Sequence, residues 1–421
     1  MPTFDVTPSK HIYNALVQDI DANQAISDLI DNAIDNAKVQ KKTTLEISIT
    51  VTENKIEVKD NSGGLDLSTI PLLLMPGGTN RSGGAGIKGI WGVGSKRAMF
   101  SLGEKISIKT RKSGQIGLIL ELDESWFQED ESTDKWKVDY EEDSSLEEGI
   151  TTITLTDLKV ILNDYSISTL RKYIAKTNKD EIEDESLTIL FNSEKVKFTL
   201  EEPWSKSEYT PPSRYTTDIP VIKSDRKLHF KMTLGIMTRP GEDYSYGIDF
   251  IGNKRVILRN NLDWRMGFKK ERLGFPHPTI NRFKAIVRVS GDSRDIPWDS
   301  AKSDINENHP MYRSITDLVF QISRQYVSFL RKNYEATSKL FKETAKETDI
   351  KDINFEYGKE FKKAVKDYKE PIEEEGISFK VPAEEFGELV KYFGLQGKTK
   401  KDIGLFIFNR VWKEVKGDVE D

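Results

Sequence analysis

The stretch DLIDNAIDNA, residues 28–37, decides the fold of this chain. Its apolar residues, with one from the preceding turn, recur at the spacing of a single helix face: Ile26, Ile30, Ala33 and Ala37. Asp28, Asn32 and Asp35 stand at i, i+4 and i+7, so they project together from the opposite face. Short polar residues favour caps and turns over helix interiors. This face is therefore either a solvated surface or part of a functional site.

The segments that follow favour a functional site. Residues 44–52 alternate as a strand with Leu45, Ile47, Ile49 and Val51 on one face. A second strand, Lys55–Lys59, runs into the turn DNSGGL at residues 60–65. The glycine-rich run GIKGIWGVGSK at residues 86–96 then opens a helix. Each part alone fits a turn or a flexible loop, but their order within one hundred residues points to a nucleotide pocket.

This arrangement resembles the GHKL ATPases, which include type II topoisomerase ATPase subunits, the ninety-kilodalton heat-shock chaperones, histidine kinases, MutL and the MORC proteins. The first family motif, Glu-x-x-x-Asn-x-x-Asp, is matched by Asp28, Asn32 and Asp35. The second, Asp-x-Gly-x-Gly, is matched by Asp60, Ser62 and Gly64, with serine at the first glycine. The third, Gly-x-x-Gly-x-Gly, is matched by Gly89, Gly92 and Gly94. A weaker fourth element, a threonine on a late strand, is Thr151.

The resemblance implies ATP and Mg²⁺ as the ligands of the pocket. Magnesium takes oxygen ligands and keeps most of its waters, so the Asn32 carbonyl and the phosphates suffice as a metal site. Asp60 can only accept hydrogen bonds when it is ionised, which selects the exocyclic amine of adenine. Gly64 lets the base lie close to the backbone, and Thr151 would contact Asp60 or a water beside adenine.

The triphosphate is expected at the glycine loop. The loop amides can point at phosphate as the next helix begins. The expected phosphate-side residues are Lys88, Gly89, Gly92, Val93, Gly94, Ser95 and Lys96, with Asp35 completing the first motif. The lysines, taken alone, fit solvated surface positions equally well. The glycine-rich segment Leu74–Ala85 matches the ATP lid of the family, or else an ordinary loop.

One departure from the family bears on catalysis. The family has glutamate as general base where this chain has Asp28. Aspartate is shorter by one carbon, or about 1.5 Å of reach, and a displacement of about 1 Å can cost ~10²-fold in rate. ATP binding followed by slow hydrolysis is therefore the expectation.

Composition agrees with a multidomain protein that works in the cytoplasm. The chain has 421 residues, 31% of them charged, and a net charge of −6, which argues against a dominant basic surface for nucleic acid. Without cysteine it can form neither disulfides nor thiolate metal sites. The N-terminal residues lack the pattern of a signal peptide, and no apolar run is long enough to span a membrane. The four histidines show no metal spacing.

The fold class implied by the resemblance is α+β, in three domains. A Bergerat α/β sandwich is expected over residues 1–160, with an exposed acidic insertion at Asp123–Glu148. A transducer domain with a ribosomal-protein-S5-like fold is expected over residues 161–335, including a proline-rich connection at Pro203–Pro220. A helical module of two amphipathic helices, for partner or dimer contacts, is expected over residues 336–421.

Two features carry the transducer prediction. Residues 246–257 form a hairpin with Gly252-Asn253 at its turn, similar to the strand, Asn-x-Arg, strand hairpin of MutL and MORC transducers. Transducers also place a lysine against the γ-phosphate. Lys302, in the loop Ile296–Ile305, is the candidate and is grouped with Asp28 as a catalytic residue. A surface lysine is the alternative.

The predicted function is an ATP-gated conformational switch. ATP binding would close two chains into a dimeric clamp, with DNA or a protein as the partner held. One alternative is a nucleotide-binding scaffold that does not hydrolyse ATP. Another is a heat-shock-type chaperone acting on protein clients.

Overall fold

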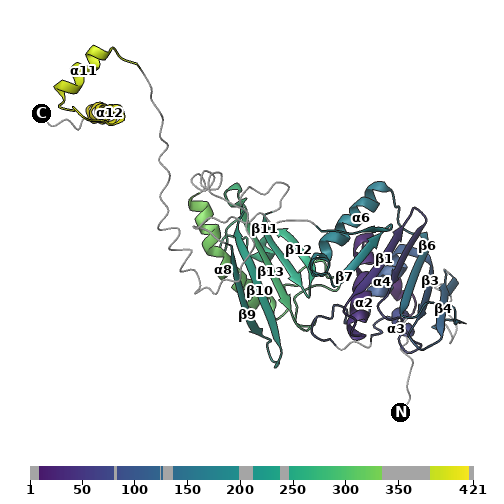
Figure 1. Ribbon diagram of the computed structural model, residues 1–421. Coiled ribbons are helices and arrows are strands. Elements are labelled where there is room, and N and C mark those ends of the chain that lie inside the picture. The colour runs from purple at the N-terminus through teal and green to yellow at the C-terminus, as the bar shows by residue number, and fades with distance from the viewer. Residues whose placement is uncertain are drawn as a thin grey trace. The chain divides into compact units, whose positions relative to one another are not determined.

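The computed structural model describes residues 9–79, 83–123, 125–126, 136–198, 212–237, 246–333 and 380–416. These residues divide into two compact units, one within residues 1–368 and the other within residues 369–421. The larger unit holds two sheets and most of the helices, as the ribbon in Figure 1 shows. The fold is mixed α and β, so the α+β prediction is confirmed.

The first sheet has eight strands in the order β5-β4-β3-β6-β2-β1-β7-β8. Its strands are β1 Leu45–Val51, β2 Lys55–Asp60, β3 Gly103–Arg111, β4 Gly117–Leu122, β5 Glu141–Asp143, β6 Ile150–Leu158, β7 Leu187–Phe191 and β8 Glu194–Lys195. All neighbouring strands are antiparallel except β1 and β7, which are parallel. The two strands expected from residues 44 to 59 are therefore confirmed.

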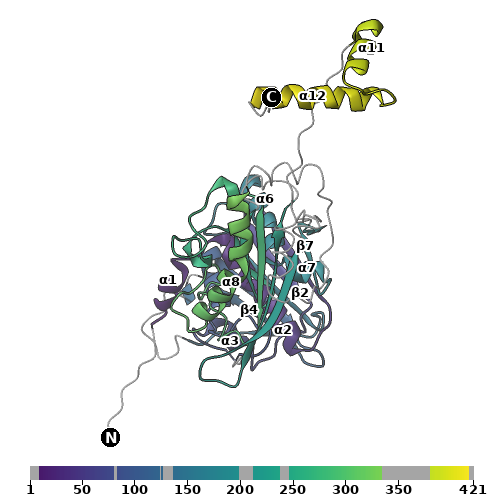
Figure 2. The ribbon, with the colours of Figure 1, turned by 90° about the vertical axis from the view of Figure 1, so that its left-hand side faces the viewer.

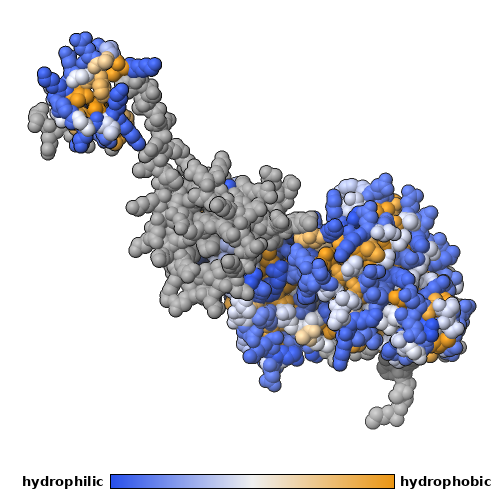
Figure 3. Space-filling model, viewed as in Figure 1, coloured by the Kyte–Doolittle hydropathy of each residue, from blue (hydrophilic) through white to orange (hydrophobic). Residues whose placement is uncertain are grey.

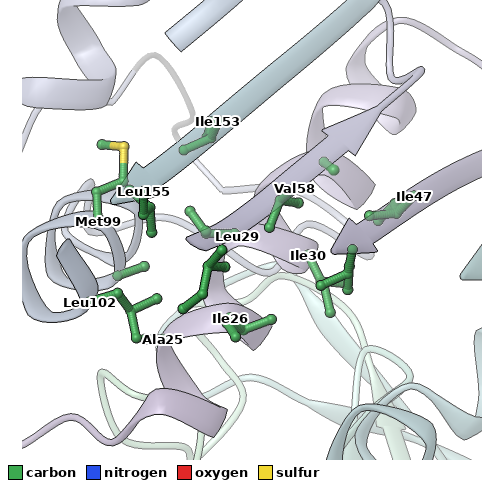
Figure 4. Packing of buried hydrophobic residues seen from close by; sticks show 14 of the residues in the cluster. Ala25, Ile26, Leu29, Ile30, Ile47, Val58, Met99, Leu102, Ile153 and Leu155 are labelled. Atoms are coloured by element: carbon green, nitrogen blue, oxygen red, sulfur yellow. The ribbon is translucent and has the colours of Figure 1, made fainter. Parts of the chain in front are cut away.

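Helices cover one face of this sheet. The central helix is α2 Ala22–Val39, with α1 Ile12–Val17, α3 Ile70–Leu74, α4 Gly94–Leu102, α6 Asp164–Thr177 and α7 Lys179–Glu183 around it. Figure 4 shows Ile26, Leu29 and Ile30 of α2 meeting apolar residues of α4 and the sheet. The strand residues alternate between buried and more exposed positions, as a one-sided sheet requires. The result is a two-layer sandwich with α2 at its centre.

The second sheet has five strands in the order β12-β11-β13-β10-β9. Its elements are β9 Ser213–Pro220, β10 Lys227–Ile236, β11 Gly247–Gly252, β12 Arg255–Asn261 and β13 Phe283–Ser290. Short 3₁₀ helices lie at η1 Trp264–Met266 and η2 Pro278–Ile280. Helix α8, Tyr312–Lys332, packs its buried stripe against β10 and β13, and Figure 2 shows it in front of these strands. The predicted turn between β11 and β12 is confirmed, with Asn253 at a φ of 45°.

Several boundaries differ from the sequence predictions. Strands β7 and β8 belong to the first sheet, which therefore continues to Lys195, well beyond residue 160. Local pattern could not show this, because β7 reaches β1 only after the crossover through α6 and α7. The end of the proline-rich connection is strand β9, and residues 203–211 of it lie outside the described part.

Most described residues of the acidic insertion are exposed, as expected, but its two tryptophans are partly buried. Trp126 and Trp136 pack against Tyr13 of α1, with ring centroids 6.2 and 5.9 Å away. The Tyr13 hydroxyl donates to the carbonyl of Leu74, at the end of α3. These contacts join the N-terminal helix to the start of the expected lid, while residues 124 and 127–135 lie outside the described part.

The two sheets of the larger unit are joined by ion pairs as well as by packing. Arg288 of β13 forms a two-pronged pair with Asp180 of α7 at 2.7 and 3.1 Å. Lys254, in the β11–β12 turn, pairs with Asp184 at the end of α7. The hairpin of the second sheet is therefore fixed against the helical layer of the first.

The smaller unit is a pair of amphipathic helices, α11 Ala383–Tyr392 and α12 Lys400–Lys416. Phe393 and Phe406 pack at a centroid distance of 5.6 Å, and Ile403 is buried. Apolar side chains such as Leu405 and Trp412 stay about half exposed, and Figure 3 shows apolar residues on the surface of this unit. Among all residues described, no helix is both long and apolar enough to cross a bilayer.

Candidate nucleotide site

A cavity of about 370 Å³ opens beside α2, at the ends of the central strands. This volume lies within the range of small-molecule pockets. The sequence-predicted residues that line it are Asp28, Asn32, Asp60, Gly64, Gly89, Gly92, Val93, Gly94, Ser95, Lys96, Thr151 and Lys302. The fold thus brings four motifs and one distant lysine to a single hollow. Asp35 and Lys88, both described, are not among its lining residues.

The polar face of α2 is buried rather than solvated. The helix starts at a capping box in which Asp21 accepts from the Gln24 amide and Gln24 reaches back to the Asp21 amide. Further along, Asp28 is 2% exposed and Asp35 is fully buried. The solvated-face alternative is therefore wrong. A buried carboxylate in a helix interior needs partners, and the surrounding loops supply them.

Asp60 lies at the end of β2, on the floor of the cavity. It is 7% exposed, and its carboxylate accepts from the Ser62 amide at 2.9 Å. Asn36 of α2 braces this turn by donating to the Ser62 hydroxyl at 2.9 Å and to the Gly64 carbonyl at 3.3 Å. The Asp60 side chain is therefore held in place at the wall of the cavity.

The glycine loop is held against α2 by Asp35. Its two carboxylate oxygens accept from the backbone amides of Lys88 and Gly89, at 2.9 and 2.7 Å. Helix α4 then begins at Gly94 with no side-chain cap at Val93. The first amides of a helix have no intrahelical partners, so an uncapped start of this kind suits an anion.

Lys302 enters the cavity from the loop that follows β13. Its ammonium lies 2.8 Å from Asp31 Oδ2 and 3.5 Å from Asp28 Oδ1. Its backbone adopts the left-handed conformation, with a φ of 53°. The loop is fixed by Asp299, which accepts from the Lys302 amide through its carbonyl and from the Ser303 amide through its carboxylate. Lys302 therefore reaches the cavity from a distant part of the chain, and its contact with a γ-phosphate stays a prediction.

The β11–β12 hairpin also touches the site. Asn253 donates to the Ile87 carbonyl, just before the glycine loop, and to the Gly291 carbonyl, both at 3.1 Å. Arg255 is fully buried and donates to Asp31 at 2.7 Å and to the Ser27 carbonyl at 3.3 Å. Both residues of the Asn-x-Arg pattern thus link the second sheet to the site. Arg255 contacts α2, and Asn253 contacts the glycine-rich run.

Comparison with known families agrees with this geometry. Residues 20–157 match the family model described as histidine kinase-, DNA gyrase B-, and HSP90-like ATPase. This part of the chain is a GHKL-type ATPase domain. The match covers α2 through β6 and ends before the second sheet. No curated protein matches the chain significantly.

Two lysines of the ATPase domain differ from the sequence prediction. Lys88 is fully buried, with its ammonium 3.2 Å from Asp31 and 2.9 Å from Glu181. Lys96 lines the cavity, but its ammonium donates to the carbonyls of Leu72 and, at 3.0 Å, Gly78. Lys88 therefore stabilises the glycine loop away from the cavity, and Lys96 fastens the segment between Leu72 and Gly78 to α4.

Gly64 and Thr151 line the cavity, but their local contacts differ from those expected. A β-carbon on Gly64 would lie 2.1 Å from the carbonyl oxygen of Arg111, so glycine is required for chain packing even without a base nearby. Thr151 is the cross-strand neighbour of Asp60, but its hydroxyl pairs with the Thr110 hydroxyl at 2.9 Å. Both residues therefore shape the end of the cavity that holds Asp60.

The pKa values of three buried carboxylates in this domain are shifted in different directions. Burial raises the pKa of Asp28, although the charges of Lys302 and Arg255 oppose this. Burial also raises the pKa of Asp60, against the hydrogen bonds from Ser62. Burial alone would raise the pKa of Asp31 too, but Arg255, Lys302 and Lys88 together hold it well below its usual range. Asp31 is thus the most firmly ionised of the three.

The donor set fits a magnesium ion that is held mainly by a nucleotide. Asn32, whose side chain carries an amide oxygen, lines the cavity as Asp28 does. Within the described ranges, no group of three or more His, Cys, Asp or Glu side chains could hold a metal alone. Mg²⁺ needs few protein ligands when phosphates and water supply the others, so Asn32 is the residue that would hold it.

The sequence did not predict a site role for three residues that contact the site in the structure: Asp31, Asn36 and Arg255. Asp31 and Asn36 lie in the same helix as the first motif, and a buried polar residue in a helix interior was the available signal. Arg255 was present in the hairpin pattern, but nothing local indicated that it reaches α2.

Proposed function

We propose that the chain binds Mg²⁺-ATP in this cavity and hydrolyses it slowly. The observation that carries the proposal is the meeting of Asp28 and Asn32 from α2 with Lys302 from the second sheet, in one hollow of an ATPase domain. Asp60, at the other end, has the acceptor chemistry for the adenine amine. The α4 amides and the glycine loop then suit the phosphates.

Hydrolysis would use Asp28 as the general base. The carboxylate takes a proton from water, the water oxygen bonds to the γ-phosphorus, and the bond to the β–γ bridging oxygen breaks to release ADP. A pKa raised by burial suits a base that works near neutrality. When bound, Mg²⁺ neutralises phosphate charge, and Lys302 adds a cation for the charge that develops on the transferred group.

The slow rate follows from the position of Asp28. Its side chain is about 1.5 Å shorter than the family glutamate, and one of its oxygens lies 3.5 Å from the Lys302 ammonium. That same geometry favours a second candidate, a nucleotide-binding scaffold without useful turnover. Asp28→Asn and Asp28→Glu separate the two functions.

Turnover and ATP affinity are measured for the wild type and for both variants. The enzyme proposal expects Asp28→Asn to bind ATP but lose turnover, and Asp28→Glu to match or exceed the wild-type rate. Equal and negligible turnover in all three proteins, with ATP bound, would support the scaffold instead. Failure of the wild type to bind ATP would contradict both the ATPase and the scaffold function.

We further propose that ATP closes two chains into a clamp. Lys302 and Arg255 give the second sheet a direct contact with the pocket helix, so nucleotide binding can bias the second sheet's position. ATP changes an equilibrium only by its difference in affinity for the two states, and about 5.5 kcal/mol is needed to move it from 1:99 to 99:1.

Light scattering after size exclusion tests the clamp. A non-hydrolysable ATP analogue should shift the mass from one chain toward two, while ADP should not. A monomer under saturating analogue would contradict the clamp and leave ATP binding intact. A third run with duplex DNA tests for the partner, since a DNA complex should dissociate as salt rises.

A further inference from the structure

A buried network of six charged side chains adjoins the cavity, and two of its members, Asp28 and Lys302, line it. Its anions are Asp28, Asp31 and Glu181, and its cations are Lys88, Arg255 and Lys302. Each is at most 5% exposed. The charges balance, three against three, so removing or adding one charge has a large effect.

Asp31 is the centre of this network. Its Oδ1 atom lies 3.2 Å from Lys88, and its Oδ2 atom is shared between Arg255 at 2.7 Å and Lys302 at 2.8 Å. These three cations come from the glycine loop, the β11–β12 hairpin and the loop after β13. One carboxylate therefore joins three segments that are far apart in the sequence.

Of the three cations, all of them in described segments, Lys302 alone lines the cavity. Lys88 has a second partner in Glu181, and Arg255 has one in the Ser27 carbonyl. The second contact of Lys302 is Asp28, which itself faces the cavity. Lys302 is thus the cation that an incoming triphosphate can attract without dismantling the rest of the network.

The loop of Lys302 is held by contacts that do not involve Asp31. The Asp299 carbonyl accepts from the Lys302 amide at 3.1 Å, and an isolated bridge joins Trp298 to Ile305. A left-handed backbone at a residue other than glycine persists when its surroundings over-determine it. Asp31 consequently controls where the ammonium points rather than where the loop runs.

We propose that Asp31 is a positioning residue that holds the Lys302 ammonium until a γ-phosphate competes for it. In this arrangement, Asp31 lowers the affinity for ATP relative to ADP, because the γ-phosphate must draw Lys302 away from a full negative charge. After Lys302 leaves, Asp31 still pairs with Arg255 and Lys88, so the hairpin and the glycine loop stay attached to α2. The inference rests on the proposed ATP binding and adds how the second sheet senses the third phosphate.

The test is the ratio of ADP to ATP-analogue dissociation constants, measured by calorimetry on the full chain. Asp31→Asn keeps the size and one acceptor oxygen but removes the charge. It should raise the preference for the triphosphate about tenfold, the difference between a charged and a neutral hydrogen-bond partner. The same substitution in a Lys302→Met background should leave the preference unchanged. A purely structural role for Asp31 would not depend on Lys302.

Two further variants complete the test. Glu181→Gln is the matched control, because Glu181 pairs with Lys88 whereas Lys302 pairs with Asp28 and Asp31, and it should leave the preference unaltered. If Asp31→Asn does not fold, Asp31→Asn/Arg255→Gln removes one buried cation together with the anion and should show the same raised preference. A folded Asp31 variant with the wild-type ATP to ADP ratio would overturn the proposal, while ATP binding itself would stand. Absence of ATP binding by the wild type would instead remove the proposed function.

Discussion

Gly64 and Gly114 offer a matched pair of substitutions to alanine. Both have a left-handed backbone, with φ of 71° and 73°. A β-carbon on Gly114 would meet no heavy atom within 4 Å, whereas one on Gly64 would lie 2.1 Å from the Arg111 carbonyl oxygen and 2.8 Å from the Lys112 amide. The two changes therefore share a conformational cost and differ only in the clash.

The magnitudes follow from these two terms. A left-handed backbone costs an ordinary residue about 1 to 2 kcal/mol, so Gly114→Ala should lose roughly that much free energy of unfolding. Gly64→Ala adds the overpacking of a backbone that cannot rotate away, a further 1 to 3 kcal/mol approximately. Its loss should thus be about 2 to 5 kcal/mol. It should also displace the turn that carries Asp60, and so weaken nucleotide binding.

Urea denaturation followed by circular dichroism measures the two losses, with the slope of the transition checked against the wild type. ATP affinity is measured on the same samples below the transition. Gly114→Ala should bind ATP as the wild type does. Equal losses of stability for the two variants would refute the argument that Gly64 is required by its contact with β3.

Three other predictions concern the pocket directly. Asn32→Ala should abolish the dependence of ATP affinity on Mg²⁺ in calorimetry, and an undiminished magnesium effect would exclude Asn32 as the ligand. Asp60→Asn should weaken ATP binding by roughly 10- to 100-fold with an unchanged circular dichroism spectrum, and an unaltered affinity would remove Asp60 from the adenine site. Lys302→Ala should lower turnover more than affinity, and should move the acid limb of the kcat/KM profile to higher pH. The sign follows because turnover needs ionised Asp28. Burial raises the pKa of Asp28 and Lys302 partly lowers it, so removing Lys302 raises that pKa further. An acid limb that moves to lower pH would contradict this coupling.

The core of the ATPase domain was predictable because its signals are local. The 3.6-residue period of α2, the alternation in β1 and β2 and the glycines that precede α4 all appear within short windows of sequence. The β11–β12 turn was predictable for the same reason, since Gly252 and Asn253 suit a tight hairpin.

The errors all concern contacts between distant parts of the chain. Lys88 looked like a phosphate ligand because its partner Glu181 lies 93 positions later, on a helix outside the matched region. Asp31 lacked an assigned role because its partners Arg255 and Lys302 lie on the second sheet and its loop. No local pattern encodes such a meeting, which depends on the tertiary fold.

The central claim is that the cavity beside α2 binds Mg²⁺-ATP. Isothermal titration of a non-hydrolysable ATP analogue into the full chain, with magnesium present, tests it most directly, with Asp60→Asn as the control. One nucleotide should bind per chain, and the control should lose affinity markedly. No binding to a wild-type chain whose circular dichroism shows it to be folded would contradict the account.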